Sequence, residues 1–141
     1  MTKPFLLALI GMLGAASASA AGPSPAQKLA AAHAAGLAIK GGKAFDECGQ
    51  PVDDIQVEQV DLNGDKLPEQ IVTIGSPCYG NGGSMFAVLR KTPAGWVSVF
   101  SASGIASVLK VVHGGWKDIE VGGPGMGRMP VVKWTGAHYA E

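Results

Sequence analysis

Side chains that offer oxygen ligands are concentrated in one stretch, residues 61–69. Carboxylate and carboxamide groups stand at its relative positions 1, 3, 5 and 9, and they belong to Asp61, Asn63, Asp65 and Glu69. A loop that wraps a hard cation needs oxygens at such a spacing, with a backbone carbonyl, here that of Leu67, at position 7. The stretch therefore predicts a calcium site with these residues as ligands.

A metal-free turn is the alternative interpretation of the same stretch. Asn63-Gly64 and Gly64-Asp65 favour tight turns without any ion, and the carboxylates of Asp61 and Asp65 can accept hydrogen bonds from turn amides. The sequence leaves both interpretations open. If calcium binds, a weak site with a Kd of about 10⁻⁴ to 10⁻³ M would suit an extracellular compartment, where the ion is plentiful.

Residues that favour β-structure flank this stretch on both sides. Residues 55–60 predict one strand, and residues 70–74 predict the next. The run 71–74 has apolar residues on both faces of the strand, with Thr73 as the exception. This pattern is typical of a central strand that is covered on both sides. The order strand, calcium-type loop, strand positions the candidate ligands between two neighbouring strands.

Residues 57–74 resemble the calcium loop of the FG-GAP/VCBS-type repeats that form blades of integrin-like β-propellers. In that family a D-x-[DN]-x-[DN] core with an acid at position 9 is followed directly by a hydrophobic strand, as in this chain. An EF-hand instead has its acid at position 12, where this chain has Val72. The resemblance implies a structural calcium ion held by positions 1, 3, 5, 7 and 9 of the stretch.

The chain departs from that family pattern at two positions. Lys66 stands where the family usually has glycine, and its ammonium group would lie beside the cation. Glu69 replaces the commoner aspartate. Both departures lower the expected affinity. A whole propeller needs four or more blades, so the resemblance implies at most one or two blade-like sheets.

The first 20 residues have the pattern of a removable signal peptide. Lys3 supplies the positive end, residues 5–13 are an apolar run, and Ala18-Ser19-Ala20 is a small-residue cleavage site. We therefore expect residues 1–20 to be removed and residues 21–141 to form a single periplasmic or secreted domain. An uncleaved membrane anchor is the alternative, and the shortness of the apolar run argues against it.

The charge balance of the expected mature domain is nearly even, at ten basic against eleven acidic residues. Nucleic-acid binding depends on the neutralisation of phosphates by basic side chains, so this balance argues against it. The same balance argues against a polybasic membrane patch.

Cys48 and Cys78 are the two cysteines of the chain. In an exported protein such a pair indicates a disulfide, and two free buried thiols are the alternative. The bond would close a loop of about 30 residues around the calcium-type stretch, which stabilises the fold by ~3–4 kcal/mol in the chain-entropy description.

The remaining sequence predicts one helix followed by short strands. Ser24, Pro25 and Gln27 form a capping-box pattern, and the alanine-rich sequence after them predicts a helix over about 25–40, ended by Gly41-Gly42. Six or seven short strands follow within 55–140. The expected fold is mainly β (α+β): an antiparallel sheet, or two packed sheets, with one N-terminal helix. The expected strands cover 55–60, 71–74, 85–91, 96–100, 108–112, 117–121 and 131–134. Residues 43–54 are expected to be a loop, and 101–107 a turn or short helical piece.

Two glycine-rich loops are candidates for partner binding, because loops on a rigid sheet often carry recognition. They are residues 75–84 and 122–130, and plain surface connections are the alternative interpretation. The second loop has an arginine and two methionines, which are residue types suited to interfaces. The candidate partner-binding residues are Tyr79, Asn81, Met126, Arg128 and Met129.

Signatures of catalysis are missing from the sequence. It contains no G-x-S-x-G elbow, no HExxH motif and no paired-cysteine zinc pattern, and its three histidines are scattered. We therefore expect a non-catalytic binding module with a calcium loop and one disulfide, whose partner is another protein. The alternative is a periplasmic inhibitor or immunity protein that blocks a peptidoglycan-degrading enzyme, such as a lysozyme or amidase, by inserting a loop.

Overall fold

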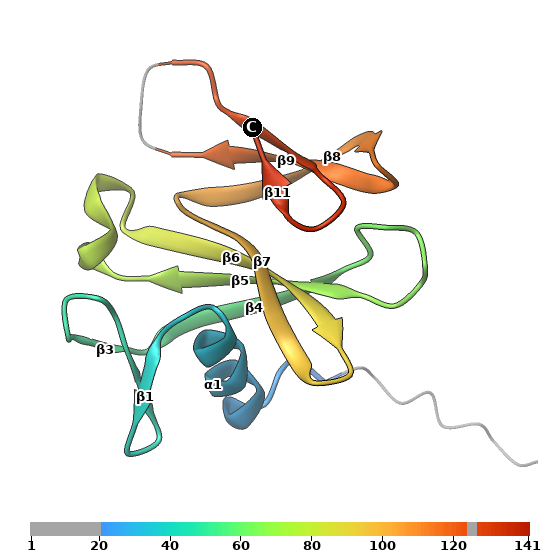
Figure 1. The fold of residues 1–141 in the computed structure, drawn as a ribbon. Helices are drawn as coiled ribbons and strands as arrows, with labels where there is room; N and C mark the ends of the chain where they lie inside the picture. Colours follow the sequence, from blue (N-terminus) through green and yellow to red (C-terminus); the bar gives the residue numbers. More distant parts are fainter. Residues whose placement is uncertain (1–20, 124–126) are drawn as a thin grey trace, which may run out of the picture.

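The structure, a computed structural model, describes residues 21–123 and 127–141 (Figure 1). The predicted signal peptide and Met126 lie outside these residues. None of the helices in the described part is long and apolar enough to cross a membrane. The elements are α1 (Pro25–Ala34), β1 (Ala38–Lys40), β2 (Lys43–Phe45), β3 (Pro51–Val52), β4 (Asp54–Val60), β5 (Glu69–Gly75), η1 (Pro77–Gly82), β6 (Ser84–Thr92), β7 (Gly95–Ser103), β8 (Ile105–His113), β9 (Trp116–Gly122), β10 (Val131–Trp134) and β11 (Tyr139–Ala140).

The strands form three antiparallel sheets in which sequence neighbours pair. The orders are β1-β2-β3, β4-β5-β6-β7 and β8-β9-β10-β11. The predicted mainly-β architecture with one N-terminal α-helix is confirmed. The described residues contain eleven strands rather than six or seven, because β2 and β3 lie in the predicted loop 43–54, β1 lies in the predicted helix, and β11 adds a two-residue strand at the C-terminus.

Helix α1 begins as predicted and ends earlier than predicted. The Ser24 hydroxyl accepts from the Gln27 N–H at 3.2 Å, and the Gln27 side chain accepts from the Ser24 N–H at 2.7 Å, which completes the capping box. The helix ends at Ala34 instead of near residue 40, because Gly36 adopts the left-handed conformation with φ of 102°. The following residues form strand β1.

The β4–β7 sheet is the middle layer of the molecule (Figure 1). Helix α1 and the small β1–β3 sheet cover one face, and the β8–β11 sheet covers the other. Successive side chains of β5 point to opposite faces of the middle sheet. Val72 therefore packs into a first core, which lies under α1 and the β1–β3 sheet, and Ile71 packs into a second core, which lies under the β8–β11 sheet. In β6, Leu89 and Val88 divide in the same way. The prediction of a strand covered on both sides is therefore confirmed for β5.

The second core, between the two larger sheets, is rich in aromatic side chains. The rings of Trp116 and Trp134 stack with their centroids 4.0 Å apart, and Tyr139 meets Trp134 edge-on at 5.4 Å. The Tyr139 hydroxyl donates to the Lys117 carbonyl at 2.8 Å. Aromatic contacts of this kind stabilise a core beyond their buried area, so this cluster fastens β11 to the rest of its sheet.

The chain passes from the middle sheet to the outer sheet at a single glycine. Strand β7 runs to Ser103 and β8 begins at Ile105, so the turn or helical piece expected over 101–107 is instead two strands separated by Gly104. Gly104 has φ of 117°, and a Cβ there would collide with the carbonyl oxygen of Gly122. Only glycine fits this corner without a backbone shift.

The predicted disulfide between Cys48 and Cys78 is present and joins the β2–β3 turn to η1. The buried carboxylate of Asp46 lies beside it and accepts from the Ser76 hydroxyl and from the N–H of Gln50 and of Cys48. These hydrogen bonds, that of Ser76 foremost, hold the pKa of Asp46 below its usual value. The disulfide and this carboxylate together brace the loop before β6.

Candidate functional site

The predicted calcium ligands form the loop between β4 and β5. Asp61 accepts hydrogen bonds from the N–H groups of Gly64, at 2.8 Å, and of Lys66, at 2.9 Å. Asn63 accepts from the Asp65 N–H at 3.1 Å, and Asp65 accepts from the Leu67 N–H at 2.8 Å. The candidate ligands therefore shape the turn through their own side chains, as the turn interpretation requires. These bonds leave further lone pairs on each carboxylate.

Lys66 adopts a backbone conformation that glycine reaches without strain. Its φ of 66° is the only left-handed value at a non-glycine position among the described residues. A side chain in this conformation costs roughly 1–2 kcal/mol. The strain is offset at least in part by the hydrogen bond from the Lys66 N–H to Asp61.

Glu69 anchors the loop to the interior. Its side chain is 4% exposed, and its Oε2 atom accepts from the Leu62 N–H at 2.8 Å. Leu62 is fully buried in the second core, and its carbonyl accepts from the Lys117 N–H of β9 at 2.8 Å. The candidate site is therefore fastened to both large sheets through Leu62.

The three loop carboxylates influence one another electrostatically. Burial raises the pKa of Glu69, and the negative charges of Asp65 and Asp61 raise it further, against the effect of the Leu62 N–H. Burial also acts to raise the pKa of Asp61, but hydrogen bonds from loop amides, with that of Lys66 the largest, outweigh it and lower the pKa. Glu69 therefore lies in a field of negative charge that a bound cation would relieve.

The donor set fits calcium in chemistry, while its carboxylates are spread apart. Three carboxylates, one carboxamide and one carbonyl are the hard oxygen ligands that calcium prefers. Within residues 21–123 and 127–141, the one group of three acidic, histidine or cysteine ligand atoms lying within 4.8 Å of one another is Asp46 with Cys48 and Cys78, whose sulfurs form the disulfide. Calcium would therefore have to draw the loop carboxylates together.

The two predicted binding loops meet at one side of the molecule. Asn81 from the first loop and Met129 from the second line a pocket of about 450 Å³ at the corner between β7 and β8. Ile105, which is 58% exposed, lies in the same pocket. Arg128 is exposed beside Met129 but does not line it. The structure thus brings together two of the five candidate partner-binding residues.

The first of these loops is more ordered than a flexible glycine-rich connection. It forms the 3₁₀-helix η1, whose N-cap hydroxyl on Ser76 accepts from the Cys78 N–H at 3.1 Å. Tyr79 packs against the first core, and its hydroxyl is buried without a hydrogen-bond partner among the described residues. Burial, followed by the charge of Asp46, raises the pKa of Tyr79. Tyr79 is thus turned inward, away from the surface predicted for it.

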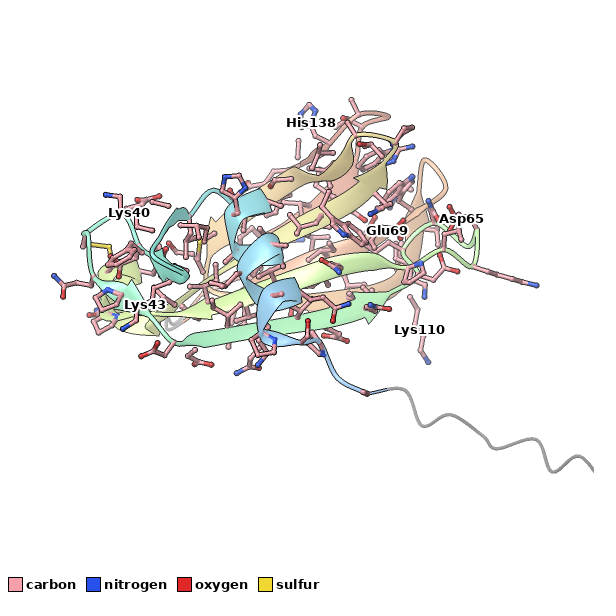
Figure 2. All side chains as sticks on the ribbon, turned by 90° about the horizontal axis from the view of Figure 1, so that it is seen from below. Lys40, Lys43, Asp65, Glu69, Lys110 and His138 are labelled. Carbon is pink, nitrogen blue, oxygen red and sulfur yellow. A yellow bond between two sulfur atoms is a disulfide. The ribbon has the colours of Figure 1, made fainter. Side chains whose placement is uncertain are left out.

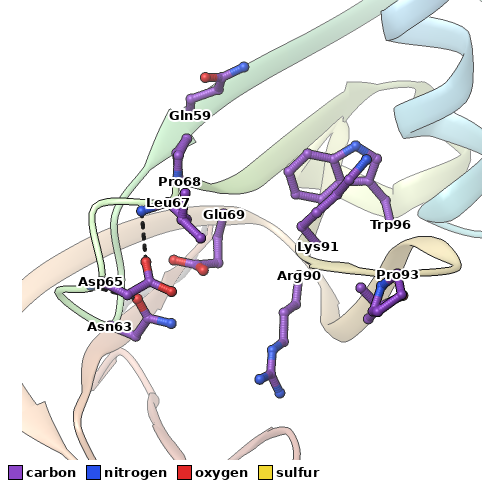
Figure 3. A pocket seen from close by; sticks show the side chains of 11 residues that line it. Gln59, Asn63, Asp65, Leu67, Pro68, Glu69, Arg90, Lys91, Pro93 and Trp96 are labelled. Carbon is purple, nitrogen blue, oxygen red and sulfur yellow. Dashed lines mark hydrogen bonds between the residues drawn. The ribbon is translucent and has the colours of Figure 1, made fainter.

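A second pocket, which the sequence did not predict, lies beside the calcium-type loop (Figure 3). It has a volume of about 520 Å³. Asn63, Asp65 and Glu69 lie on one side, and residues of the β6–β7 hairpin lie on the other (Figure 3). The residues that line it are Gln59, Asn63, Asp65, Leu67, Pro68, Glu69, Arg90, Lys91, Thr92, Pro93 and Trp96.

The order of the strands indicates where this second pocket lies. In a meander of antiparallel strands, the connections after the first and third strands lie at the same end of the sheet. The β4–β5 loop and the predicted turn at 92–95 are such connections. The basic pair Arg90-Lys91 and Trp96 flank that turn, so the order of strands places them near residues 61–69.

The comparisons with known proteins give no relative. The chain matches no protein-family description, and neither curated proteins nor solved structures show significant similarity to it.

Proposed function

We propose that this protein is a non-catalytic, exported binding module. In this proposal the 61–69 loop binds calcium in a structural role, and a partner protein binds the surface around Asn81, Ile105 and Met129. The disulfide at Cys48–Cys78 supports an oxidising compartment, where such bonds persist. The proposal keeps the ion and the partner at separate sites.

One observation carries the proposal of a binding surface. Asn81 and Met129 come from loops far apart in sequence, yet they line the same pocket together with the exposed side chain of Ile105. The disulfide and the Ser76 N-cap fix the first loop, and Gly104 fixes the corner between the sheets. Recognition residues on a braced scaffold lose little conformational entropy when a partner binds.

The electrostatics of the loop support the calcium role. Burial raises the pKa of Glu69, and the negative charges of Asp65 and Asp61 in the same loop raise it further. A divalent cation would neutralise this charge and tighten the loop around Leu62, which is packed in the second core. Calcium binding would therefore act on the packing between the two large sheets.

Calorimetry on the mature, oxidised protein tests the calcium role. We expect one site of about 10⁻⁴ to 10⁻³ M, lost in Asp61→Ala. Glu58→Gln is the matched control, because Glu58 is an exposed carboxylate on β4 outside the loop. Absence of binding heat and of a thermal shift at millimolar calcium would reduce residues 61–69 to a metal-free turn.

A pull-down from periplasmic extract tests the partner surface. The protein should retain one partner in near-stoichiometric amount, and Ile105→Asp or Met129→Asp should each abolish this retention. Val97→Asp serves as the control, because Val97 is 42% exposed on β7 and lines neither pocket. Equal retention by all four proteins would contradict the assignment of this surface.

The second candidate function is inhibition of a peptidoglycan-degrading enzyme by the 122–130 loop. Residues 127–130 are all exposed, including Arg128 and Met129. An exposed arginine with an adaptable methionine suits insertion into an active-site cleft. This candidate predicts that the retained partner is a lysozyme or amidase, that the protein lowers its activity, and that Arg128→Ala weakens the inhibition. A retained partner without hydrolase activity would exclude it.

A further inference from the structure

A small cavity that belongs to neither site above lies close to the disulfide. It has a volume of about 170 Å³, and its lining includes Ala38 of β1, Phe45 of β2, Tyr79 of η1 and Met85 of β6. Figure 2 shows the disulfide, in yellow, at the opposite end of the molecule from the calcium-type loop, where Asp65 is labelled. The volume suits a small chemical group, because drug-sized ligands occupy pockets of about 300–1,000 Å³.

The hydroxyl group of Tyr79 needs a hydrogen-bond partner that the described residues do not provide. The oxygen is buried and unpaired, whereas buried polar groups in folded proteins are nearly always paired. The Tyr79 ring packs against the first core, and the residue lines the cavity. A ligand in the cavity that carries N–H or O–H donors would therefore satisfy this hydroxyl oxygen.

The cavity is electrically negative. Asp46 and Glu47 line it, and none of its lining residues is a lysine, an arginine or a histidine. These two acidic residues are consecutive, but they belong to the turn after β2 and not to a strand, so their side chains need not point to opposite faces of a sheet. Burial raises the pKa of Tyr79, and the charges of Asp46 and then Glu47 raise it further. Both negative charges thus act on the same hydroxyl.

The buried charge of Asp46 has no cationic partner. Among the described residues, the one ion pair with a nitrogen–oxygen distance within 4.0 Å is His113–Asp118, in the outer sheet. Asp46 is 6% exposed, and buried carboxylates are usually paired with a cation. Its Oδ1 atom accepts from two backbone N–H groups, but its Oδ2 atom accepts only from the Ser76 hydroxyl. A lone pair on Oδ2 is therefore left for a cationic donor.

The remaining lining suits a short hydrocarbon chain attached to such a cation. Leu37 and Met85 are buried members of the first core, whereas Glu47 is exposed, so the cavity leads from the surface towards apolar side chains. Phe45 and Tyr79 add aromatic rings, whose faces attract ammonium groups. A chain of a few methylene groups would therefore find apolar contacts beside the charged groups.

We propose that this cavity binds an alkylammonium group, whose N–H groups donate to the Tyr79 hydroxyl and to the carboxylates of Asp46 and Glu47. A free amine and a lysine side chain of another protein share this chemistry. Calcium fits less well, because it takes roughly six to eight oxygen ligands and Asp46 already accepts three hydrogen bonds from its own loop. A neutral alcohol would pair with the hydroxyl but would leave the carboxylate charge unpaired. The site depends neither on the calcium role nor on the partner surface proposed above.

Nuclear magnetic resonance titration in EDTA tests this proposal with defined probes. The first probe is n-butylammonium chloride, and n-butanol and sodium chloride at matched concentration are the comparisons. We expect saturable shifts of the Tyr79 amide and the Met85 methyl group with the ammonium ion. Binding of the alcohol should be weaker by about tenfold or more, since it lacks the charge-assisted hydrogen bonds. Sodium chloride should produce no saturable shift.

A second probe distinguishes the two sources of the ammonium group. Nα-acetyl-lysinamide carries the same four-carbon ammonium chain on a peptide unit. Binding at least as tight as that of n-butylammonium would identify a protein lysine as the ligand, and binding of n-butylammonium alone would identify a free amine. Either result supports the proposal.

Two conservative substitutions complete the test. Tyr79→Phe removes only the hydroxyl and Glu47→Gln removes only a charge, and each should weaken binding of n-butylammonium several-fold. Asp46 stays unchanged in these variants, because it also braces the loop before β6. Glu58→Gln is the matched control, since Glu58 is an exposed carboxylate on β4 that does not line the cavity. Equal binding of ammonium and alcohol, the absence of saturable shifts, or parental binding by either Tyr79→Phe or Glu47→Gln would overturn the proposal.

Discussion

Replacing Glu69 by glutamine separates the charge of this residue from its hydrogen bond. The amide oxygen of glutamine can still accept from the Leu62 N–H, so the anchor of the loop is retained. The variant removes a carboxylate whose burial and acidic neighbours raise its pKa. In the absence of calcium, we therefore expect the Glu69→Gln variant to melt at a higher temperature than the parent at pH 7.

The pH dependence of stability has a defined sign. The folded-state pKa of Glu69 lies above its ordinary value of 4.5, so its stabilising contribution is complete below that value and is lost as the pH rises through the raised pKa. Asp46 and Asp61 have lowered pKa values, so their contributions are lost only as the pH falls below 3.8. The calcium-free parent should therefore lose stability as the pH rises above 4.5, and Glu69→Gln should lose less.

Calcium should reverse the order of the melting temperatures of the parent and the Glu69→Gln variant. With a Kd of 10⁻⁴ to 10⁻³ M, the ion at about 10 mM stabilises the folded state by about 1.4–2.7 kcal/mol. For a domain of this size that corresponds to a rise in Tm of roughly 4–10 °C. The parent should show this rise and Glu69→Gln should lose most of it, with Glu58→Gln as the control.

Circular dichroism melting curves, with EDTA or calcium and at several pH values, measure both effects. A lower Tm for calcium-free Glu69→Gln than for the parent at pH 7 would refute the argument, because it would mean that the charge of Glu69 stabilises the loop. An undiminished calcium effect in the variant would remove Glu69 from the ligand set.

Three further substitutions test the packing that positions the loops. Leu62→Ala should lower the free energy of unfolding by about 3 kcal/mol in urea denaturation, because it empties a fully buried site in the second core. Gly104→Ala should cost more than about 1 kcal/mol by the same assay, since the new Cβ would collide with Gly122 at a left-handed position; an unchanged midpoint would show that the corner relaxes freely. Replacing Cys48 and Cys78 by alanine should cost ~3–4 kcal/mol, and a loss below 1 kcal/mol would contradict the bracing role of the disulfide.

Local patterns in the sequence predicted most of the individual elements. The capping box at Ser24 and Gln27 has a mechanism that acts within a few residues, so the start of α1 could be predicted. The apolar residues Ile71, Val72 and Ile74 predicted the central position of β5, because a strand covered on both sides places apolar side chains on both of its faces. The disulfide followed from the presence of two cysteines in a chain with a signal-peptide pattern.

Local sequence patterns did not predict the features that depend on tertiary packing. Alanine favours a helix beyond residue 34, but Ile39 instead pairs with Ala44 in the small sheet that covers the first core. The small polar residues after position 100 resemble a turn, yet they continue β7 because the sheet extends that far. The pocket between Glu69 and Lys91 required strand order as well as strand identity, and no single segment encodes that order.

The pairing of each strand with its neighbour in sequence has a consequence for folding. All ladders in the described part join consecutive strands, so each can form by closing a short connection. Proteins rich in such local contacts reach the transition state with a smaller loss of chain entropy than sandwiches whose strands pair across the sequence. We therefore expect the middle sheet to assemble rapidly and vectorially from its N-terminal strand, with the hydrogen bond from the Lys117 N–H to the Leu62 carbonyl closing late, when the outer sheet docks.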